Sequence, residues 1–131
     1  MLTKVDSFSR ASVEQDTGRI YLFGDNIEDM FSDFVPRATQ AVIRGLPNAI
    51  GIPTKKDRLT LQKSFFENND LDFASFKHYT DAAIDRAKAL GTEFVISAAG
   101  IGTGHATLFG AFADPESRFH KYLQQKLKEL E

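Results

Sequence analysis

Apolar runs alternate along the chain with amphipathic stretches. Residues 19–26, RIYLFGDN, are aromatic and β-branched and then stop at Gly-Asp-Asn, which predicts a buried strand running into a loop. Residues 48–56, NAIGIPTKK, predict a second strand that Pro53 helps to end, and residues 93–99, EFVISAA, predict a third. A further strand is expected near residues 3–8.

Three helices are expected between and after these strands. Residues 36–44 begin with proline, which suits a first helical turn, and are followed by a glycine that can end the helix. A longer helix is predicted from its N-cap Asp72 to Gly91, because apolar residues recur there at helical spacing. The last helix is expected to begin at Asp114 as its N-cap, and residues 57–72 are expected to form a loop with short pieces of structure.

Strands that alternate with helices indicate an α/β fold, three-layered α/β/α, with a mostly parallel sheet. In such a sheet, ligands bind beyond the carboxyl ends of the strands. The segments GDN, PTKK and GIGTGH each follow a predicted strand, so we expect the fold to gather them at one edge.

Composition limits the possible functions. The chain has 131 residues, of which 42% are hydrophobic and 26% charged, which is typical of one globular domain spanning residues 1–131. It has no cysteine, so disulfides and thiolate metal sites are excluded, and no helical His-Glu pair indicates another metal site. We therefore expect no metal and no cofactor.

Charge and hydropathy bear on partners and location. The net charge is −2 and the basic residues are scattered, so the concentrated basic surface that nucleic-acid binding requires is missing. The N-terminus is polar, without the apolar core of a signal peptide, and no apolar run is long enough to span a membrane. We expect a cytoplasmic protein with no membrane partner and no nucleic-acid partner.

The segment SAAGIGTGHATLFG carries glycines at three alternate positions, Gly100, Gly102 and Gly104. Unobstructed backbone N–H groups there can form a concave nest for a phosphate, and the Thr103 hydroxyl can add a donor. The spacing matches neither the dinucleotide-binding fingerprint nor the P-loop. A plain strand-to-helix turn is the alternative, but it needs fewer glycines.

Polar residues at the other two strand ends have similar alternatives. Asp25 and Asn26 can make an Asx-turn, or they can hydrogen-bond an amide or a ribose hydroxyl that enters the cleft. Lys55 and Lys56 can form a solvated basic pair, or one of them can neutralise a phosphate. His105, next to the glycines, can serve as an acid or base, although most surface histidines do not.

Three segments together resemble a known family: IGIPTKKDR, FASFKHYTDAAIDRAKALG and FVISAAGIGTGHATL. The chain resembles a macrodomain, of the branch that includes the terminal ADP-ribose glycohydrolase and the antitoxin that reverses DNA ADP-ribosylation. The resemblance extends from about Arg19 to the C-terminus. The chain is similar, more closely, to short uncharacterised phage and bacterial proteins that contain FGDN, PTK and GTG.

The resemblance implies an ADP-ribose-type ligand and assigns residues to it. Thr54 and Lys55 match the motif at the strand end, where Lys55 takes the place of the glycohydrolase's catalytic lysine. Gly102–Gly104 match the turn that wraps the diphosphate, and Asp25 and Asn26 fall near the family's first ligand loop.

Two departures from the family pattern weaken glycosidic cleavage. Ala106 stands where the family has its catalytic aspartate, two residues after the last loop glycine. The family's glycine-rich first loop is replaced here by residues 27–40, which contain no glycine and carry the acidic residues Glu28, Asp29 and Asp33. These carboxylates would repel a diphosphate if they pointed into the cleft.

The leading interpretation is a protein that binds ADP-ribose or a related nucleotide, with weak hydrolase activity at most. Lys55 would then act on the distal ribose and His105 would be the nearby base, and restoring a carboxylate with Ala106→Asp would raise activity. The rival interpretation is a phage-type protein-interaction or inhibitor module. In that case Met30, Phe31 and Phe34 in the loop 27–40 would contact a protein partner.

Overall fold

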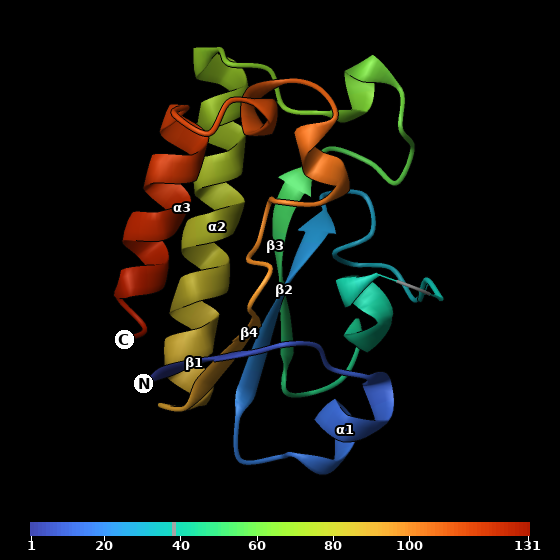
Figure 1. Cartoon of the computed structure of the whole chain (residues 1–131), viewed down its shortest axis with the longest axis vertical. Helices are drawn as coiled ribbons and strands as arrows, with labels where there is room; N and C mark the ends of the chain where they lie inside the picture. Colours follow the sequence, from blue (N-terminus) through green and yellow to red (C-terminus); the bar gives the residue numbers. More distant parts are fainter. Residues whose placement is uncertain (38) are drawn as a thin grey trace.

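The computed structural model describes residues 1–37 and 39–131, and it has one four-stranded sheet. Its strands are β1 (Leu2–Val5), β2 (Ile20–Asn26), β3 (Ala49–Lys55) and β4 (Phe94–Ser97). They lie in the order β1-β4-β2-β3, and every neighbouring pair is parallel (Figure 1). The predicted α/β class with a parallel sheet is confirmed.

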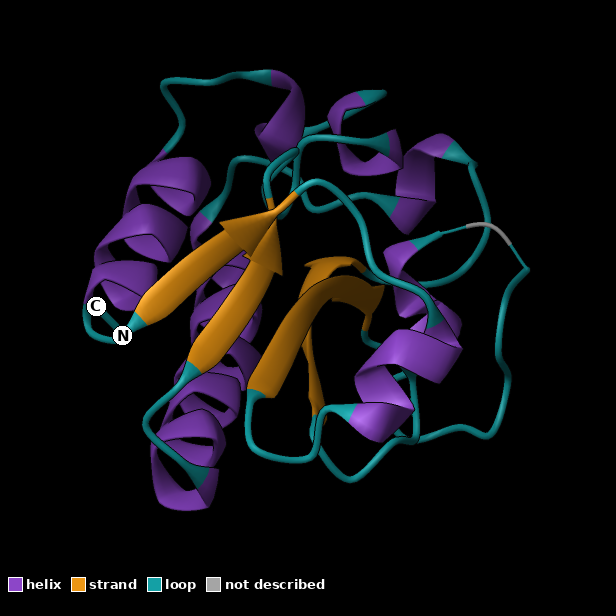
Figure 2. Cartoon of the chain, turned by 60° about the horizontal axis from the view of Figure 1, so that its bottom comes forward, coloured by secondary structure: helices purple, strands orange, loops and turns teal. Residues whose placement is uncertain are grey.

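Helices cover both faces of the sheet. The α-helices α2 (Asp70–Leu90) and α3 (Arg118–Lys128) lie side by side on one face, and the short helix α1 (Arg10–Gln15) and the 3-10 helix η1 (Gln40–Ile43) lie on the other (Figures 1 and 2). Three further 3-10 turns lie beyond the carboxyl ends of the strands: η2 (Gln62–Ser64), η3 (His105–Thr107) and η4 (Ala111–Ala113). The arrangement is therefore three-layered, as predicted.

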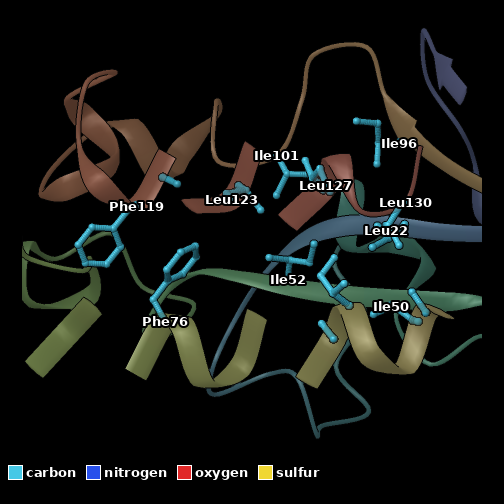
Figure 3. Packing of buried hydrophobic residues seen from close by; sticks show 14 of the residues in the cluster. Leu22, Ile50, Ile52, Phe76, Ile96, Ile101, Phe119, Leu123, Leu127 and Leu130 are labelled. Carbon is cyan, nitrogen blue, oxygen red and sulfur yellow. The ribbon is translucent and has the colours of Figure 1, made fainter. Parts of the chain in front are cut away.

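The two cores follow from the alternation of side chains along the strands. Leu22, Ile50 and Ile52 face α2 and α3 and belong to one hydrophobic cluster with Phe76 and Phe119 (Figure 3). The intervening positions of β2 and β3 face α1 and η1, where the smaller cluster forms from Val13, Tyr21, Phe23, Ala41, Ile43, Leu46, Ala49 and Val95. Each fully buried apolar side chain of this size contributes about 1.5–3 kcal/mol, so the sheet is held from both sides.

The helix predicted over residues 36–44 is wrong in extent. Residue 38 of this stretch lies outside the described residues, and among the others only residues 40–43 are helical, as the 3-10 turn η1. The Thr39 hydroxyl caps this turn by accepting from the Ala41 N–H at 3.3 Å. The turn ends because Arg44 adopts an extended ψ of 137°. Proline at position 36 does not begin a helix, because the cap comes three residues later.

Two other helix starts differ from the sequence-based expectation. α2 begins at residue 70, and its cap is Asn69, whose side chain accepts from the Asp72 N–H at 2.8 Å. α3 begins at residue 118, and Ser117 caps it, whereas the Asp114 carboxylate accepts from the Glu116 N–H at 2.9 Å in the preceding turn. Asp72 thus lies inside the first turn of α2, where its carboxylate accepts from the Glu67 N–H at 2.7 Å, and Asp114 lies in the turn that precedes α3.

Helix α1 was not predicted. A reciprocal capping box between Ser9 and Ser12 stabilises its first turn, and Val13 is its only buried residue. Within residues 1–37 and 39–131, no helix is long and apolar enough to cross a membrane.

Candidate ligand-binding site

Strands β2 and β4 separate toward their carboxyl ends. They pair only at Ile20–Phe94 and Tyr21–Val95, although β4 stays paired with β1 as far as Ser97. The chain that leaves β2 passes to η1 on one face, and the chain that leaves β4 passes to α3 on the other. Crevices between strands whose connections leave to opposite faces are the usual ligand sites of open α/β sheets.

The side chain of Gln40 bridges this crevice. Its Oε1 accepts from the Gly24 N–H at 3.3 Å, and its Nε2 donates to the Gly100 carbonyl at 3.0 Å. Gln40 thereby connects the end of β2 to the first residue of the glycine segment. Sequence analysis missed this residue, and its only signal was a polar side chain directly before an apolar run.

A cleft opens beside Gln40. It has a volume of about 570 Å³, within the usual range for small-molecule sites. It is bounded by the segment that follows β1, by the last residue of β4 and by the approach to η1. The lining residues are Ser7, Phe8, Ser9, Arg10, Val35, Pro36, Arg37, Thr39, Gln40, Val42 and Ser97.

Among the described residues, two arginines and no carboxylate line this cleft, so its charge is positive. Arg10 donates to two backbone carbonyls, those of Val42 at 3.0 Å and Arg44 at 2.8 Å, and Arg37 is exposed. Neither arginine forms an ion pair with any carboxylate of the described residues. Such a site favours an anionic ligand.

The three glycines of the glycine segment, residues 100–104, occupy different backbone and packing environments. Gly100 and Gly102 have φ of +88° and +78°, which favour glycine, whereas Gly104 has φ of −97°. A Cβ at Gly102 would lie 2.8 Å from the Phe112 ring, and a Cβ at Gly104 would meet nothing within 4 Å. The Thr103 hydroxyl donates to the Ala99 carbonyl at 2.5 Å. Packing against Phe112 thus accounts for Gly102, and the phosphate nest stays a prediction.

Asp25 and Asn26 are buried and engaged within the protein. The Asp25 carboxylate pairs with the Arg44 guanidinium and also accepts from the Asn26 N–H at 2.8 Å. The Asn26 side chain accepts from the Asp29 N–H at 2.9 Å and donates to the Asp29 carboxylate at 3.0 Å. The Asx-turn alternative describes this region, with a buried ion pair added to it.

The acidic loop after β2 is partly neutralised by Arg58. Its guanidinium lies 2.6 Å from the Asp29 carboxylate and 3.1 Å from that of Glu28. Burial acts to raise the pKa of Asp29, but hydrogen bonds from Asn26, Arg58 and Ser32 outweigh it and hold that pKa below its usual value. Repulsion of a diphosphate by this loop is therefore weaker than the sequence implies.

Thr54 and the two lysines lie outside the cleft lining. The Lys55 ammonium donates to the Leu59 carbonyl at 2.6 Å and lies 5.1 Å from the centre of the Phe65 ring. Burial lowers the pKa of Lys55, and the charge of Asp57 acts in the opposite direction. Lys56 instead pairs with Asp72 at 2.9 Å, and buried Thr54 has its hydroxyl 3.5 Å from the Asp25 carbonyl.

His105 is exposed at the start of η3 and does not line the cleft. The structure therefore places only some of the residues expected at the site next to the cleft. Gly100 reaches it through Gln40, whereas Thr54, Lys55 and His105 lie elsewhere at the carboxyl edge. Among residues 1–37 and 39–131, no group of three His, Asp or Glu side chains is arranged to hold a metal ion.

The chain belongs to a family of unknown function, DUF7831, whose model matches residues 3–126. Comparison with curated proteins and with solved structures found no match. The relationship to macrodomains consequently stays a prediction from the sequence motifs.

Proposed function

We propose that the protein binds a small phosphate-bearing molecule of the nucleotide type, such as ADP-ribose, in the cleft beside Gln40. The observation that carries the proposal is the pair of arginines, Arg10 and Arg37, which line a cleft without a carboxylate at the carboxyl edge of a parallel sheet. Guanidinium groups bind phosphates through charge-assisted hydrogen bonds. The hydroxyls of Ser7 and Thr39 on the same lining are further polar groups for a sugar phosphate.

This proposal concerns binding. Weak hydrolysis by Lys55 and His105 is a separate proposal that rests on the family resemblance and on the lowered pKa of the Lys55 ammonium. The cytoplasmic location also stays a prediction from the polar N-terminus.

Arg37 provides a clean test because it is exposed and forms no ion pair within the described residues. Isothermal titration with ADP-ribose and ribose 5-phosphate should show binding, and ribose without phosphate should not bind. Arg37→Gln should weaken both phosphate ligands by about tenfold or more, since a hydrogen bond to a charged group contributes about 1.5–3 kcal/mol. Arg86→Gln, at an exposed arginine outside this cleft, is the matched control. Equal affinities for the two variants, or no binding by the unmodified protein, would overturn the proposal.

A second candidate function is contact with a protein partner through the loop 27–40. The observation that favours it is Phe31, whose exposed fraction is 82%, beside a smaller groove of about 260 Å³ along β3. Phe34, in contrast, is held against the Arg58 guanidinium, 4.2 Å from its ring centre. A partner retained by the unmodified protein and by Lys63→Met, at an exposed lysine outside the loop, but lost with Phe31→Ser, would support this function. A partner retained equally by all three would contradict it.

A further inference from the structure

The Gly24 N–H is a strand amide that the sheet leaves without its usual acceptor. Ile20 donates to the Glu93 carbonyl, so alternate residues of β2 direct their N–H groups toward β4. The acceptor that would face Gly24 in a continued ladder is the Ser97 carbonyl, but this group accepts from the Gly100 N–H at 2.9 Å as the chain turns away. The Gly24 N–H therefore donates to Oε1 of the Gln40 side chain.

Gly24 and Gly100 together present one donor and one acceptor to the same crevice. The side-chain amide of Gln40 satisfies both with its adjacent carbonyl and N–H groups. The hydrogen bond to Gly24 is long at 3.3 Å, whereas amide hydrogen bonds are usually 2.7–3.2 Å. Gln40 is half-buried, lies on a single 3-10 turn and also lines the cleft, so its flexible side chain has room to leave.

We propose that the Gly24 N–H and the Gly100 carbonyl recognise an amide group of the ligand, either a carboxamide or a lactam edge of a nucleobase. In the free protein, the side-chain amide of Gln40 occupies the position that this ligand amide would take. This inference rests on the proposed function, because the phosphate of the same ligand would lie at Arg10 and Arg37. It narrows the ligand to phosphate-bearing molecules that also carry an amide, which ADP-ribose lacks. The ligand amide accepts from Gly24, donates to Gly100 and displaces the Gln40 side chain. A carboxylate in that position would lack the donor and would face the Gly100 carbonyl with a negative charge.

Two mononucleotides that differ only in this group give the sharpest test. Nicotinamide mononucleotide carries a carboxamide, nicotinic acid mononucleotide carries a carboxylate, and ribose 5-phosphate lacks the ring. Isothermal titration of the unmodified protein should favour the carboxamide by about tenfold. Gln40→Ala removes the internal competitor and should raise the ratio of the affinity for nicotinamide mononucleotide to that for ribose 5-phosphate by about fivefold.

Nuclear magnetic resonance gives a second readout that does not depend on the variant. The amide resonance of Gly24 in the unmodified protein should shift with nicotinamide mononucleotide and stay in place with ribose 5-phosphate. Equal affinities for the two mononucleotides, or a Gly24 amide that does not respond, would overturn the inference. If ribose 5-phosphate binds and Arg37→Gln weakens it in the same experiment, the proposed function stands and only the amide recognition fails. Absence of all phosphate-dependent binding would instead overturn the proposed function.

Discussion

Asp25 and Arg44 form an ion pair that is almost completely buried, with exposed side-chain fractions of 1% and 6%. The pair connects the end of β2 to the residue that follows η1, which are 19 positions apart. Gly51 on β3 makes room for it, because a Cβ there would lie 2.5 Å from Oδ2 of Asp25. The aspartate that the sequence places in a ligand loop therefore has a structural partner.

Breaking this pair from one side should be costly. Asp25→Ala leaves the Arg44 guanidinium buried without its carboxylate, and we expect a loss of about 3–5 kcal/mol in the free energy of unfolding. Arg44→Met alone should cost a similar amount for the converse reason. The double variant should lose less than the sum of the two, as measured by urea denaturation of all four proteins. Additive losses would show that the two charges do not depend on each other.

The glycine segment offers a matched comparison. Gly102→Ala would place a Cβ against the Phe112 ring at a left-handed φ, which alone costs about 1–2 kcal/mol. Gly104→Ala enters open space and needs no left-handed φ, although its ψ of −123° lies outside the α and β regions, so it should cost less than Gly102→Ala. Thermal unfolding of the two variants should separate them clearly. A larger loss for Gly104→Ala would contradict the local backbone assignment.

The elements predicted correctly are those in which local pattern and tertiary role agree. β2 and β3 are long apolar runs buried on both faces, and α2 has apolar residues at helical spacing ended by Gly91. Helix α1 was not predicted, because its single buried residue, Val13, gives no repeating apolar pattern. Helix 36–44 was overextended because proline is compatible with a helix start but does not require one.

The site was harder to predict than the fold. Three strand ends were expected at one edge, and the parallel sheet brings them there. Which side chains face a cleft depends on pairings between distant residues, such as Asp25 with Arg44 and Gln40 with both Gly24 and Gly100. The spacing of residues in a single sequence does not reveal such contacts between distant positions. Gln40 was therefore missed, and Asp25 was assigned to a ligand.

Ala106 tests the expectation that an aspartate there would restore catalysis. It is 5% exposed and belongs to the larger hydrophobic cluster. Ala106→Asp would therefore bury a carboxyl group among apolar side chains, and we expect a loss of about 3–5 kcal/mol, the cost of an uncompensated buried charge. His105→Asp, at the exposed neighbouring position, should be tolerated. Urea denaturation of the two variants measures this difference in the free energy of unfolding. An Ala106→Asp protein as stable as the His105→Asp protein would mean that position 106 can open to solvent.

Lys55 should make stability depend on alkaline pH. Burial lowers the pKa of its ammonium in the folded protein below the ordinary value of 10.5, with Asp57 acting against this effect. Between the two pKa values the unfolded chain binds more protons than the folded protein, so the free energy of unfolding should rise with pH across that window. Below the window both states are protonated, and the folded state carries the full desolvation cost.

Lys55→Met removes this contribution, so the difference in unfolding free energy between the unmodified protein and the variant should shift in favour of the unmodified protein as pH approaches 10.5. Lys63→Met, at an exposed lysine on η2, is the control for loss of a surface charge. Urea denaturation from neutral pH to pH 10.5 measures both differences, and an NMR titration of the Lys55 side chain should show its midpoint below 10.5 directly. A Lys55 midpoint at or above 10.5 would contradict the role of burial, and it would also remove the main physical support for a reactive amine at this position.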